Sequence, residues 1–251
     1  MQEFKGKTAI VTGGAQGMGR EYVRLLAEAG ANVVLADINE AVAQETVRAL
    51  GFGDQLLVVK TDVGSAEAAQ VCAAAAVARF GGIDYLVNNA GLLSAAMHRS
   101  LIEIEAETYL RIINIMAHGM LWMARAVVPS MKSRGRGAIV NVSSIGAWQA
   151  SGVYSLAKVM VNGLTVNLAH ELAAHNIRVN AVAPGTVDTE GMQPLMTVEQ
   201  MAQWGQAGGR PTNRVAHPQE IARVGLFLLS DAASYVRGQI IPVDDGQQIR
   251  L

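Results

Sequence analysis

Tyr154 and Lys158 are the residues whose types and spacing most directly suggest chemistry. They lie four residues apart in a helical stretch, so the phenol and the ammonium would project from one helix face. A free phenol ionises near pH ~10, but a unit charge about 4 Å away at an effective dielectric of about 20 is worth roughly 4 kcal/mol. Lys158 is therefore expected to lower the pKa of Tyr154 and make it a general acid and base. A tyrosine and a lysine that merely share a helix face would give the same pattern.

Hydroxyl and amide side chains lie within reach of that pair in the sequence. Ser143 and Ser144 follow an apolar run, 138–142, and would stand at the carboxyl edge of a parallel sheet, where such folds present ligands. Because side chains alternate along a strand, only one of the two hydroxyls would face a substrate oxygen. Asn114 lies inside an otherwise apolar helix, and a buried amide is costly without partners, so we expect a fixed hydrogen-bond network or a bound water there.

A glycine-rich turn near the start of the chain has the features of an anion site. Gly13, Gly17 and Gly19 follow the apolar run 7–11, as in a strand that breaks into a turn and then a helix. The backbone N–H groups and the positive end of the helix dipole would attract a pyrophosphate. Glycine turns also close ordinary strand–helix corners, so this motif is weak when taken alone.

Asp37 supports the same interpretation. It ends a second apolar run, 32–37, and lies 18 residues beyond Gly19, near the separation at which dinucleotide folds place a ribose-binding acid. A 2′-phosphate there would meet like charge, and Ile38 and Asn39 supply no cation, so NAD is favoured over NADP. The alternative is that Asp37 caps a helix that starts near Glu40.

The elements that must position these residues alternate between strand-like and helix-like runs. This alternation predicts an α/β fold: one Rossmann-like domain, 1–251, with a doubly wound parallel sheet of about seven strands and helices on both faces. The expected strands are 7–12, 32–37, 56–61, 84–88, 137–143, 177–183 and 239–243, most of them apolar on both faces. The segment 188–210 fits no element and is expected to be a mobile substrate loop.

Apolar residues in the loops indicate a hydrophobic pocket. The residues expected to roof it are Leu92, Leu93, Trp148, Met192, Leu195, Met196, Met201 and Trp204. They favour a carbocyclic, aromatic or otherwise hydrophobic alcohol over a sugar, although any one of them could instead pack into a subunit contact. The long apolar helix expected over 153–175 also suggests self-association.

Composition excludes several classes of protein. Twenty basic and 21 acidic residues leave a formal charge of −1, which does not favour a nucleic acid or an anionic membrane. No targeting signal or uninterrupted apolar run of membrane-spanning length is present, so we expect a soluble, cytoplasmic protein. The single cysteine, Cys72, is expected to be a buried packing residue. The five histidines lack the clustering of metal ligands, and no metal site is expected.

Taken in order, these motifs resemble the short-chain dehydrogenase/reductase family over essentially the whole chain. Further matching segments are Asp62-Val63, Asn88-Asn89-Ala90-Gly91, Pro184-Gly185 and the runs 214–222 and 238–246. The resemblance implies that Tyr154 is the general acid and base and that Lys158 lowers its pKa and holds the nicotinamide ribose. It also implies that Ser144 orients the substrate oxygen and that Asn114 positions a water for proton relay. The expected contacts to NAD are Gly13, Gln16, Gly17, Met18, Gly19, Asp37, Asp62, Val63, Asn89, Ala90, Gly91, Tyr154, Lys158, Pro184, Gly185, Val187 and Thr189.

Two departures from the family pattern stand out. Ser144 and Tyr154 are ten residues apart, a few fewer than is common, so the connecting loop must be short and either Ser143 or Ser144 could point at the substrate. We favour Ser144 from the match at Asn141. The second departure is Asp244-Asp245-Gly246, where the family more often has one acid followed by two glycines.

These expectations combine into an NAD-dependent oxidoreductase that interconverts a hydrophobic secondary alcohol and its ketone. The resemblance implies a homotetramer. A 3-oxoacyl-(acyl-carrier-protein) reductase is the nearer alternative, but it would be expected to prefer NADP, against which Asp37 argues. A catalytically silent NAD-binding protein is a third possibility, but it would have no need for Tyr154, Lys158, Ser144 and Asn114 together.

Overall fold

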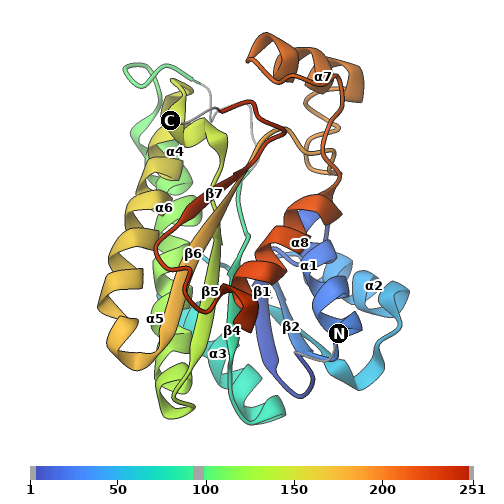
Figure 1. Ribbon diagram of the computed structural model, residues 1–251, viewed down its shortest axis with the longest axis vertical. Helices are drawn as coiled ribbons and strands as arrows, with labels where there is room; N and C mark the ends of the chain where they lie inside the picture. Colours follow the sequence, from blue (N-terminus) through green and yellow to red (C-terminus); the bar gives the residue numbers. More distant parts are fainter. Residues whose placement is uncertain (1–3, 93–98, 249–251) are drawn as a thin grey trace.

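Seven parallel strands form one sheet in the order β3-β2-β1-β4-β5-β6-β7 (Figure 1). The structure is a computed structural model that describes residues 4–92 and 99–248. The strands are β1 Thr8–Thr12, β2 Asn32–Asp37, β3 Leu56–Lys60, β4 Tyr85–Asn88, β5 Gly137–Val142, β6 Ile177–Pro184 and β7 Ile240–Val243. Each lies within one residue of its expected bounds, so the predicted α/β fold with a doubly wound parallel sheet is confirmed.

Helices cover both faces of the sheet. They are α1 Gly17–Glu28, α2 Glu40–Leu50, α3 Ala66–Phe80, α4 Ala106–Ile113, α5 Gly119–Ser133, α6 Gly152–Glu171, α7 Val198–Ala207 and α8 Pro218–Leu229. One core cluster joins the sheet to α1, α2 and α8, and a second joins it to α3, α5 and α6 (Figure 1). Strands buried on both faces explain why their sequences are almost continuously apolar.

The strand order fixes where a ligand can bind. The chain runs outward from β1 to β3 and then returns to add β4 on the other side of β1, so a crevice opens where the two halves meet. The last residues of β1, β2, β4, β5 and β6 all lie at one edge, because every pair of neighbouring strands is parallel. Most of the expected cofactor contacts follow these five strands, whereas Asp62 and Val63 follow β3.

A buried amide ladder ties the catalytic half of this edge together. The Asn88 side chain donates to Asn141 Oδ1 at 2.9 Å, and Asn141 in turn donates to the Thr165 hydroxyl at 2.9 Å. All three side chains are buried. Because these bonds link β4, β5 and α6, they fix the strand that leads to Ser144 relative to the helix that carries Tyr154.

A long continuous helix runs over Ala106–Ser133 and contains a π-helical turn at Asn114–His118 between α4 and α5. By length and composition it could cross a membrane, but 56% of its most apolar window is buried inside the protein. Met123, Ala124 and Val127 are buried in the core cluster beneath the sheet. These contacts are those of a core helix in a globular fold.

The segment 188–210 is more regular than expected, because it contains α7. Thr197 and Gln200 form a reciprocal capping box at its start. Arg210, only 5% exposed, donates to the Ala202 carbonyl at 3.0 Å and packs against Gly205, where a Cβ would overlap its guanidinium. The buried arginine thus anchors α7, which projects beyond the carboxyl edge of the sheet (Figure 1). The prediction of an irregular segment was wrong because Met, Gln and Gly obscured a short helix.

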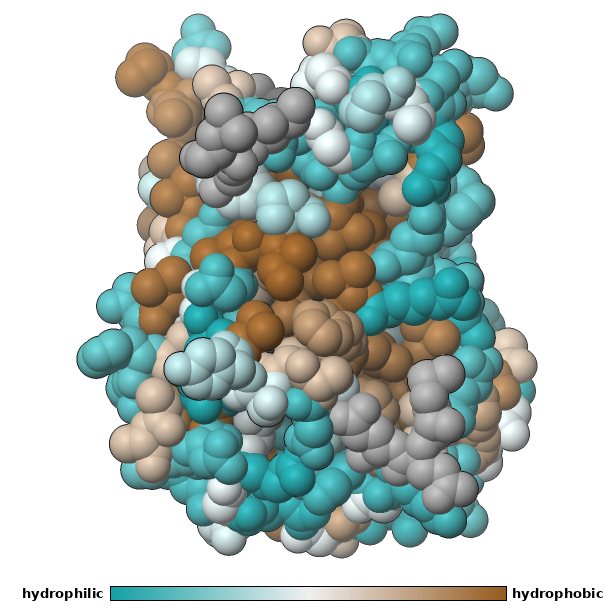
Figure 2. All heavy atoms as spheres, viewed as in Figure 1, coloured by the Kyte–Doolittle hydropathy of each residue, from teal (hydrophilic) through white to brown (hydrophobic). Residues whose placement is uncertain are grey.

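β7 ends the sheet and pairs with β6 alone among the described strands. Its residues are half-buried, and Figure 2 shows hydrophobic residues gathered in the middle of the face on which Figure 1 draws β7. Tyr235 and Phe227, from neighbouring segments, are also largely exposed. The edge therefore presents apolar surface to solvent in a single protomer.

Candidate active site

A cavity of about 770 Å³ follows the carboxyl edge of the sheet from the end of β2 to the start of α6. Its volume is within the range of small-molecule and cofactor sites. Of the residues predicted to be catalytic or to contact NAD, all line this cavity except Gly19 and Asn114. The structure therefore brings together side chains from β1, β2, β4, β5, β6 and α6 that are far apart in the sequence.

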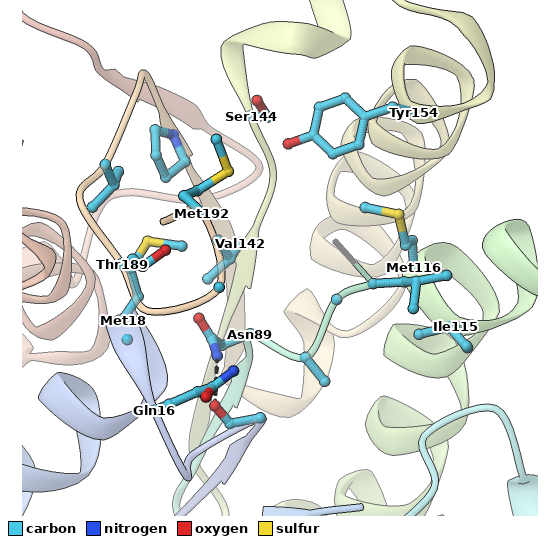
Figure 3. A pocket seen from close by; sticks show the side chains of 18 of the residues that line it. Gln16, Met18, Asn89, Ile115, Met116, Val142, Ser144, Tyr154, Thr189 and Met192 are labelled. Atoms are coloured by element: carbon cyan, nitrogen blue, oxygen red, sulfur yellow. Dashed lines mark hydrogen bonds between the residues drawn. The ribbon is translucent and has the colours of Figure 1, made fainter. Parts of the chain in front are cut away.

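Tyr154, Ser144 and Lys158 meet at one end of the cavity. A side-chain hydrogen bond joins Tyr154 and Ser144, and Figure 3 shows the Tyr154 hydroxyl directed toward Ser144. The Lys158 ammonium lies 5.8 Å from the centre of the Tyr154 ring and donates to the Val142 carbonyl at 2.8 Å. A hydroxyl pair beside a buried cation can hold an oxygen atom and exchange a proton with it.

Burial shifts the pKa values of this pair in opposite directions. It raises the pKa of Tyr154, and the hydrogen bond with Ser144 lowers it only in part. It lowers the pKa of Lys158 to about 8. The expected lowering of the Tyr154 pKa is therefore not seen, because removal of the phenol from water outweighs the groups around it that favour its ionised form. Additional positive charge in the cavity is required to bring the phenol toward neutral pH.

The two serines point to different partners. The Ser143 hydroxyl donates to Asn162 Oδ1 at 2.6 Å, whereas the Ser144 hydroxyl accepts from the Gly146 N–H at 3.0 Å and contacts Tyr154. Ser144 is thus the hydroxyl placed beside the phenol. Asn162, which holds the other serine, was not singled out in the sequence because nothing in its neighbourhood marks it.

The short connection between Ser144 and Tyr154 is closed by a single 3₁₀ turn, Ile145–Trp148, and α6 begins at Gly152. At Gly146 a Cβ would lie 2.7 Å from the Tyr154 ring. The loop therefore packs directly on the phenol, and only a glycine leaves room for it. The ten-residue spacing still permits the Ser144–Tyr154 contact, and Gly146 is a site residue that sequence reasoning missed.

Asn114 lies apart from this group. Its side chain donates to the Gly64 carbonyl at 3.0 Å, and it does not line the cavity. The sequence predicted a fixed hydrogen-bond partner for the Asn114 amide, and that partner is the backbone carbonyl of Gly64, which follows β3. The π-helical turn that begins at Asn114 was not predicted, although such turns are frequent at functional sites. A role for Asn114 in proton relay stays a prediction.

The glycine turn is fixed by close backbone approach. Gly13 has a φ of +62°, and a Cβ there would lie 2.9 Å from the Ala90 Cα atom. The Asn89 side chain donates to the carbonyls of Thr12 and Gly13 at 3.0 and 3.1 Å. A Cβ at Gly19 would overlap the Gly13 carbonyl oxygen. Gly19 therefore allows α1 to pack on the turn rather than contacting the cavity itself.

Asp37 lies at the far end of the cavity from Tyr154. Its carboxylate accepts from the N–H groups of Ala15 at 3.1 Å and Asn39 at 2.9 Å. The side chain of Asn39 accepts from the Val42 N–H, so Asn39, not Asp37, caps α2. This removes the alternative that Asp37 is a helix cap and leaves its carboxylate at the cavity wall.

The remaining expected cofactor contacts surround the space between these ends. Asp62 is exposed and Val63 buried beside it, and Asp62 accepts from the Gly64 N–H at 2.9 Å. Gln16, Met18, Ala90 and Gly91 line the wall near the glycine turn. Pro184, Gly185, Val187 and Thr189 line the opposite wall after β6. Figure 3 shows Gln16, Met18, Asn89 and Thr189 around one end of this space and Ser144 and Tyr154 at the other.

The unusual Asp244-Asp245 pair keeps the turn expected for glycine. Asp245 has a φ of +57°, one of two positive values among the described non-glycine residues, and it hydrogen-bonds the Thr212 hydroxyl. Asp244 packs against Gly185, where a Cβ would lie 3.1 Å from its Cα. The extra carboxylate thus occupies a left-handed position without displacing the segment beside β6.

Apolar side chains roof the Tyr154 end of the cavity, but not all of those expected. Leu92, Met192, Leu195, Met196 and Trp204 line it. Met201 instead packs in a small core beneath α7, and Trp148 does not line the cavity. Leu93 lies outside the described residues. Arg111 also lines the wall and was not predicted.

Other reactive side chains lie away from this cavity. Cys72 is buried in the core, and burial raises the pKa of its thiol to about 11. Within residues 4–92 and 99–248, no group of three or more His, Cys, Asp or Glu side chains could hold a metal ion.

The donor set fits a nicotinamide dinucleotide. A carboxylate stands at one end for ribose hydroxyls, helix α1 begins at the middle, and a buried lysine and tyrosine stand at the other end. The carboxylate of Glu190 already lies at the start of α1, 3.0 Å from the Gly17 nitrogen, which shows that an anion is accepted there.

Known proteins resemble this chain over nearly its whole length. Residues 13–248 match the family described as enoyl-(acyl carrier protein) reductase. An uncharacterized oxidoreductase of Mycobacterium tuberculosis is 43% identical, with 98% of this chain and 99% of that protein covered. A cis-4-hydroxycyclohexanecarboxylate dehydrogenase of Sinomonas cyclohexanicum is 41% identical, with 98% of each covered. The crystal structure of a levodione reductase has a TM-score of 0.88 at 30% identity, with 97% of this chain and 98% of that one covered.

These similarities extend across the strands, the cavity and the carboxyl-terminal segment alike. They identify an oxidoreductase fold whose members use a nicotinamide nucleotide, in agreement with the cavity described above. The chain belongs to the short-chain dehydrogenase/reductase family.

Proposed function

We propose that the protein is an NAD-dependent dehydrogenase that interconverts a hydrophobic secondary alcohol and its ketone. The observation that carries the proposal is the meeting of Tyr154, Ser144 and Lys158 at the apolar end of a cavity whose other end carries Asp37. A proton-exchanging group and a hydride-exchanging cofactor are the two requirements of this reaction.

The chain's own residues supply the proton chemistry. In the oxidation direction, Ser144 hydrogen-bonds the substrate hydroxyl and Tyr154, as phenolate, takes its proton. Lys158 supplies positive charge near the phenol and holds the nicotinamide ribose. When bound beside Lys158 and Tyr154, a nicotinamide dinucleotide would supply the hydride-exchange chemistry in either direction. The apolar roof excludes water, which strengthens each of these polar contacts.

Asp37 supports NAD as the cofactor. Its carboxylate lies at the cavity wall, where it would accept from the two ribose hydroxyls and repel a 2′-phosphate. Wild type is expected to reduce NAD faster than NADP at equal concentrations. Asp37→Ala is expected to weaken NAD binding and to shift the ratio of kcat/KM values toward NADP by at least tenfold. A ratio unchanged in this variant would contradict the ribose assignment.

The apolar lining of the roof supports a hydrophobic substrate. Met192, Leu195, Met196 and Trp204 present flat or flexible apolar surface with few polar groups. One relative is named for a substrate that is a cyclic secondary alcohol, cis-4-hydroxycyclohexanecarboxylate. NAD reduction should therefore be measured with a panel of cyclic, aromatic and aliphatic secondary alcohols, and cyclic members should give the highest kcat/KM.

An acyl-carrier ketoreductase is the second candidate, favoured by a relative that is 36% identical, a 3-oxoacyl-[acyl-carrier-protein] reductase of Thermotoga maritima. It predicts faster turnover of a 3-oxoacyl thioester with NADPH than of any alcohol with NAD. The same assay therefore separates the two enzymes. Dinucleotide binding without turnover of either substrate class would instead support a silent NAD-binding protein.

We also infer that the protein self-associates, as a homotetramer, in the cytoplasm. Leu156, Val159, Met160 and Val166 expose apolar surface along α6, and the edge strand β7 exposes more on another face. Two such surfaces on one protomer favour an assembly larger than a dimer. Light scattering coupled to size exclusion should give four times the 26.5 kDa chain mass, and a monomer mass would refute it.

A further inference from the structure

The carboxylate of Glu190 lies where an anionic cofactor is expected to bind. Glu190 follows β6, and its Oε2 atom accepts from the Gly17 N–H at 3.0 Å. Its Oε1 atom lies 2.5 Å from Arg20 on the first turn of α1. These contacts join segments 173 residues apart in the sequence.

Helix α1 has no side-chain cap or acidic residue of its own at its start. Its N-cap residue, Gln16, makes no side-chain capping bond, and no acidic residue lies in its first turn. The first N–H groups of a helix need partners and favour negative charge. Glu190 supplies a hydrogen-bond acceptor and a negative charge from a distant segment, so it caps the start of α1.

The same contact holds the segment after β6 against the glycine turn. The Thr189 side chain lies 3.3 Å from the position of a Cβ at Gly17, directly beside the Glu190 contact. Thr189 and, further along, Met192 and Trp204 line the cavity. The ion pair therefore connects the anion site at α1 to the segment that leads into the roof.

The contact is ionic and partly open to water. Burial acts to raise the pKa of Glu190, but hydrogen bonds from its own N–H and that of Gly17, together with Arg20, outweigh it and leave the pKa below its ordinary value. The Glu190 side chain is 41% exposed and that of Arg20 39% exposed. An ion pair at such exposure is weak and can be exchanged for another anion.

We propose that Glu190 is an internal competitor for the cofactor: its carboxylate occupies the Gly17 N–H and Arg20, and the dinucleotide pyrophosphate must displace it to bind. The proposal rests on the proposed function, because the competing anion is that of NAD. Glu190 thus sets the affinity for the cofactor and couples its arrival to release of the segment before α7. One N–H donor cannot serve both anions at full strength, so removal of the carboxylate should favour the cofactor.

Calorimetric titration of wild type, Glu190→Gln and Glu190→Ala with NAD, ADP-ribose and adenosine tests this competition. Glu190→Ala should lower the dissociation constants for NAD and ADP-ribose about fivefold, and Glu190→Gln should lower them less, because its amide oxygen can still accept from Gly17. Adenosine has no pyrophosphate and should bind all three proteins equally. Glu199→Gln, an exposed carboxylate change on the first turn of α7, is the matched control and should leave every constant unchanged.

The outcomes separate this proposal from the proposed function. If wild type binds NAD and the Glu190 variants bind it equally or more weakly, the competition is refuted while the dehydrogenase assignment stands. If neither wild type nor Glu190→Ala binds NAD or NADP, both fail together. A crystal structure of the wild-type complex with NAD gives an independent readout: Glu190 should have left the Gly17 N–H, and a carboxylate still bound there beside the pyrophosphate would overturn the proposal.

Discussion

The two walls of the cavity are built by different means. On the cofactor side, backbone meets backbone: Gly13 lies against Ala90, Gly19 against Gly13, and Asn89 bridges the turn. On the roof side, Met192, Leu195, Met196 and Trp204 offer interchangeable apolar surface around a helix anchored by Arg210. The first wall demands particular residues at particular positions, whereas the second demands only apolar character. The cofactor wall should therefore tolerate substitution poorly and the roof tolerate it well.

Gly19→Ala tests the cofactor wall with the largest expected effect. The new Cβ would overlap the Gly13 carbonyl, and only backbone movement can relieve it. We expect a loss of about 3 kcal/mol or more in the free energy of unfolding, measured by urea denaturation. Gly91→Ala, at the same edge, is the control because, among the described residues, its Cβ meets only the Asn89 carbonyl oxygen at 3.9 Å, and it should cost far less. Equal losses in the two variants would break the contrast between the walls.

Lys158 lies where the two walls meet. Because its ammonium is buried, the free energy of unfolding should depend on pH. Its pKa is about 8 in the folded chain, below the value of about 10.4 for a free lysine. Between these pH values the unfolded state binds more protons, so the contribution of Lys158 to stability rises with pH. Below pH 8 the charged lysine costs up to about 3 kcal/mol.

The measurement is urea unfolding of wild type and Lys158→Met at pH 7, 8 and 9.5. The stability of wild type relative to the variant should rise as the pH increases over this range. The exposed residue Lys132 provides the control, Lys132→Met, for which the difference should stay constant. A constant difference for Lys158→Met as well would show that the ammonium is not buried in solution.

Two residues of α7 test the difference between packed and cavity-lining residues within the roof. Substitution of Trp204 should have the smallest effect on the free energy of unfolding. Met201 is fully buried and Trp204 is 50% exposed at the cavity. Met201→Ala should cost about 2 kcal/mol in unfolding free energy, whereas Trp204→Ala should cost less than about 1 kcal/mol. Trp204→Ala should instead raise the KM for bulky alcohols several-fold. Loss of stability without a change in KM would place Trp204 in the core rather than the roof.

Sequence reasoning succeeded where one physical requirement selects one residue type. The strands were found because burial on both faces demands apolar β-branched runs, and the glycine turn because only glycine tolerates the approach of Ala90 and Gly13. The sequence could not show that Gly19 serves packing rather than the cavity, since both uses require the same residue.

The roof was harder to predict, because its residue types carry little positional information. Met201 and Trp204 lie three residues apart on α7, yet one packs in the core and the other lines the cavity. Helix α7 itself depends on a capping box and on a buried arginine that follows it in the chain. Long-range contacts such as that of Glu190 with Gly17 leave no local pattern at all.

The most direct test of the account compares wild type with Tyr154→Phe in two measurements, NAD binding and NAD reduction with the best alcohol of the panel. Removal of one hydroxyl leaves the ring packed on Gly146 and the cofactor wall intact. The account predicts that kcat falls about 10²- to 10⁴-fold while the dissociation constant for NAD changes less than about threefold. A variant that turns over as fast as wild type would contradict the assignment of Tyr154 as the proton-exchanging group.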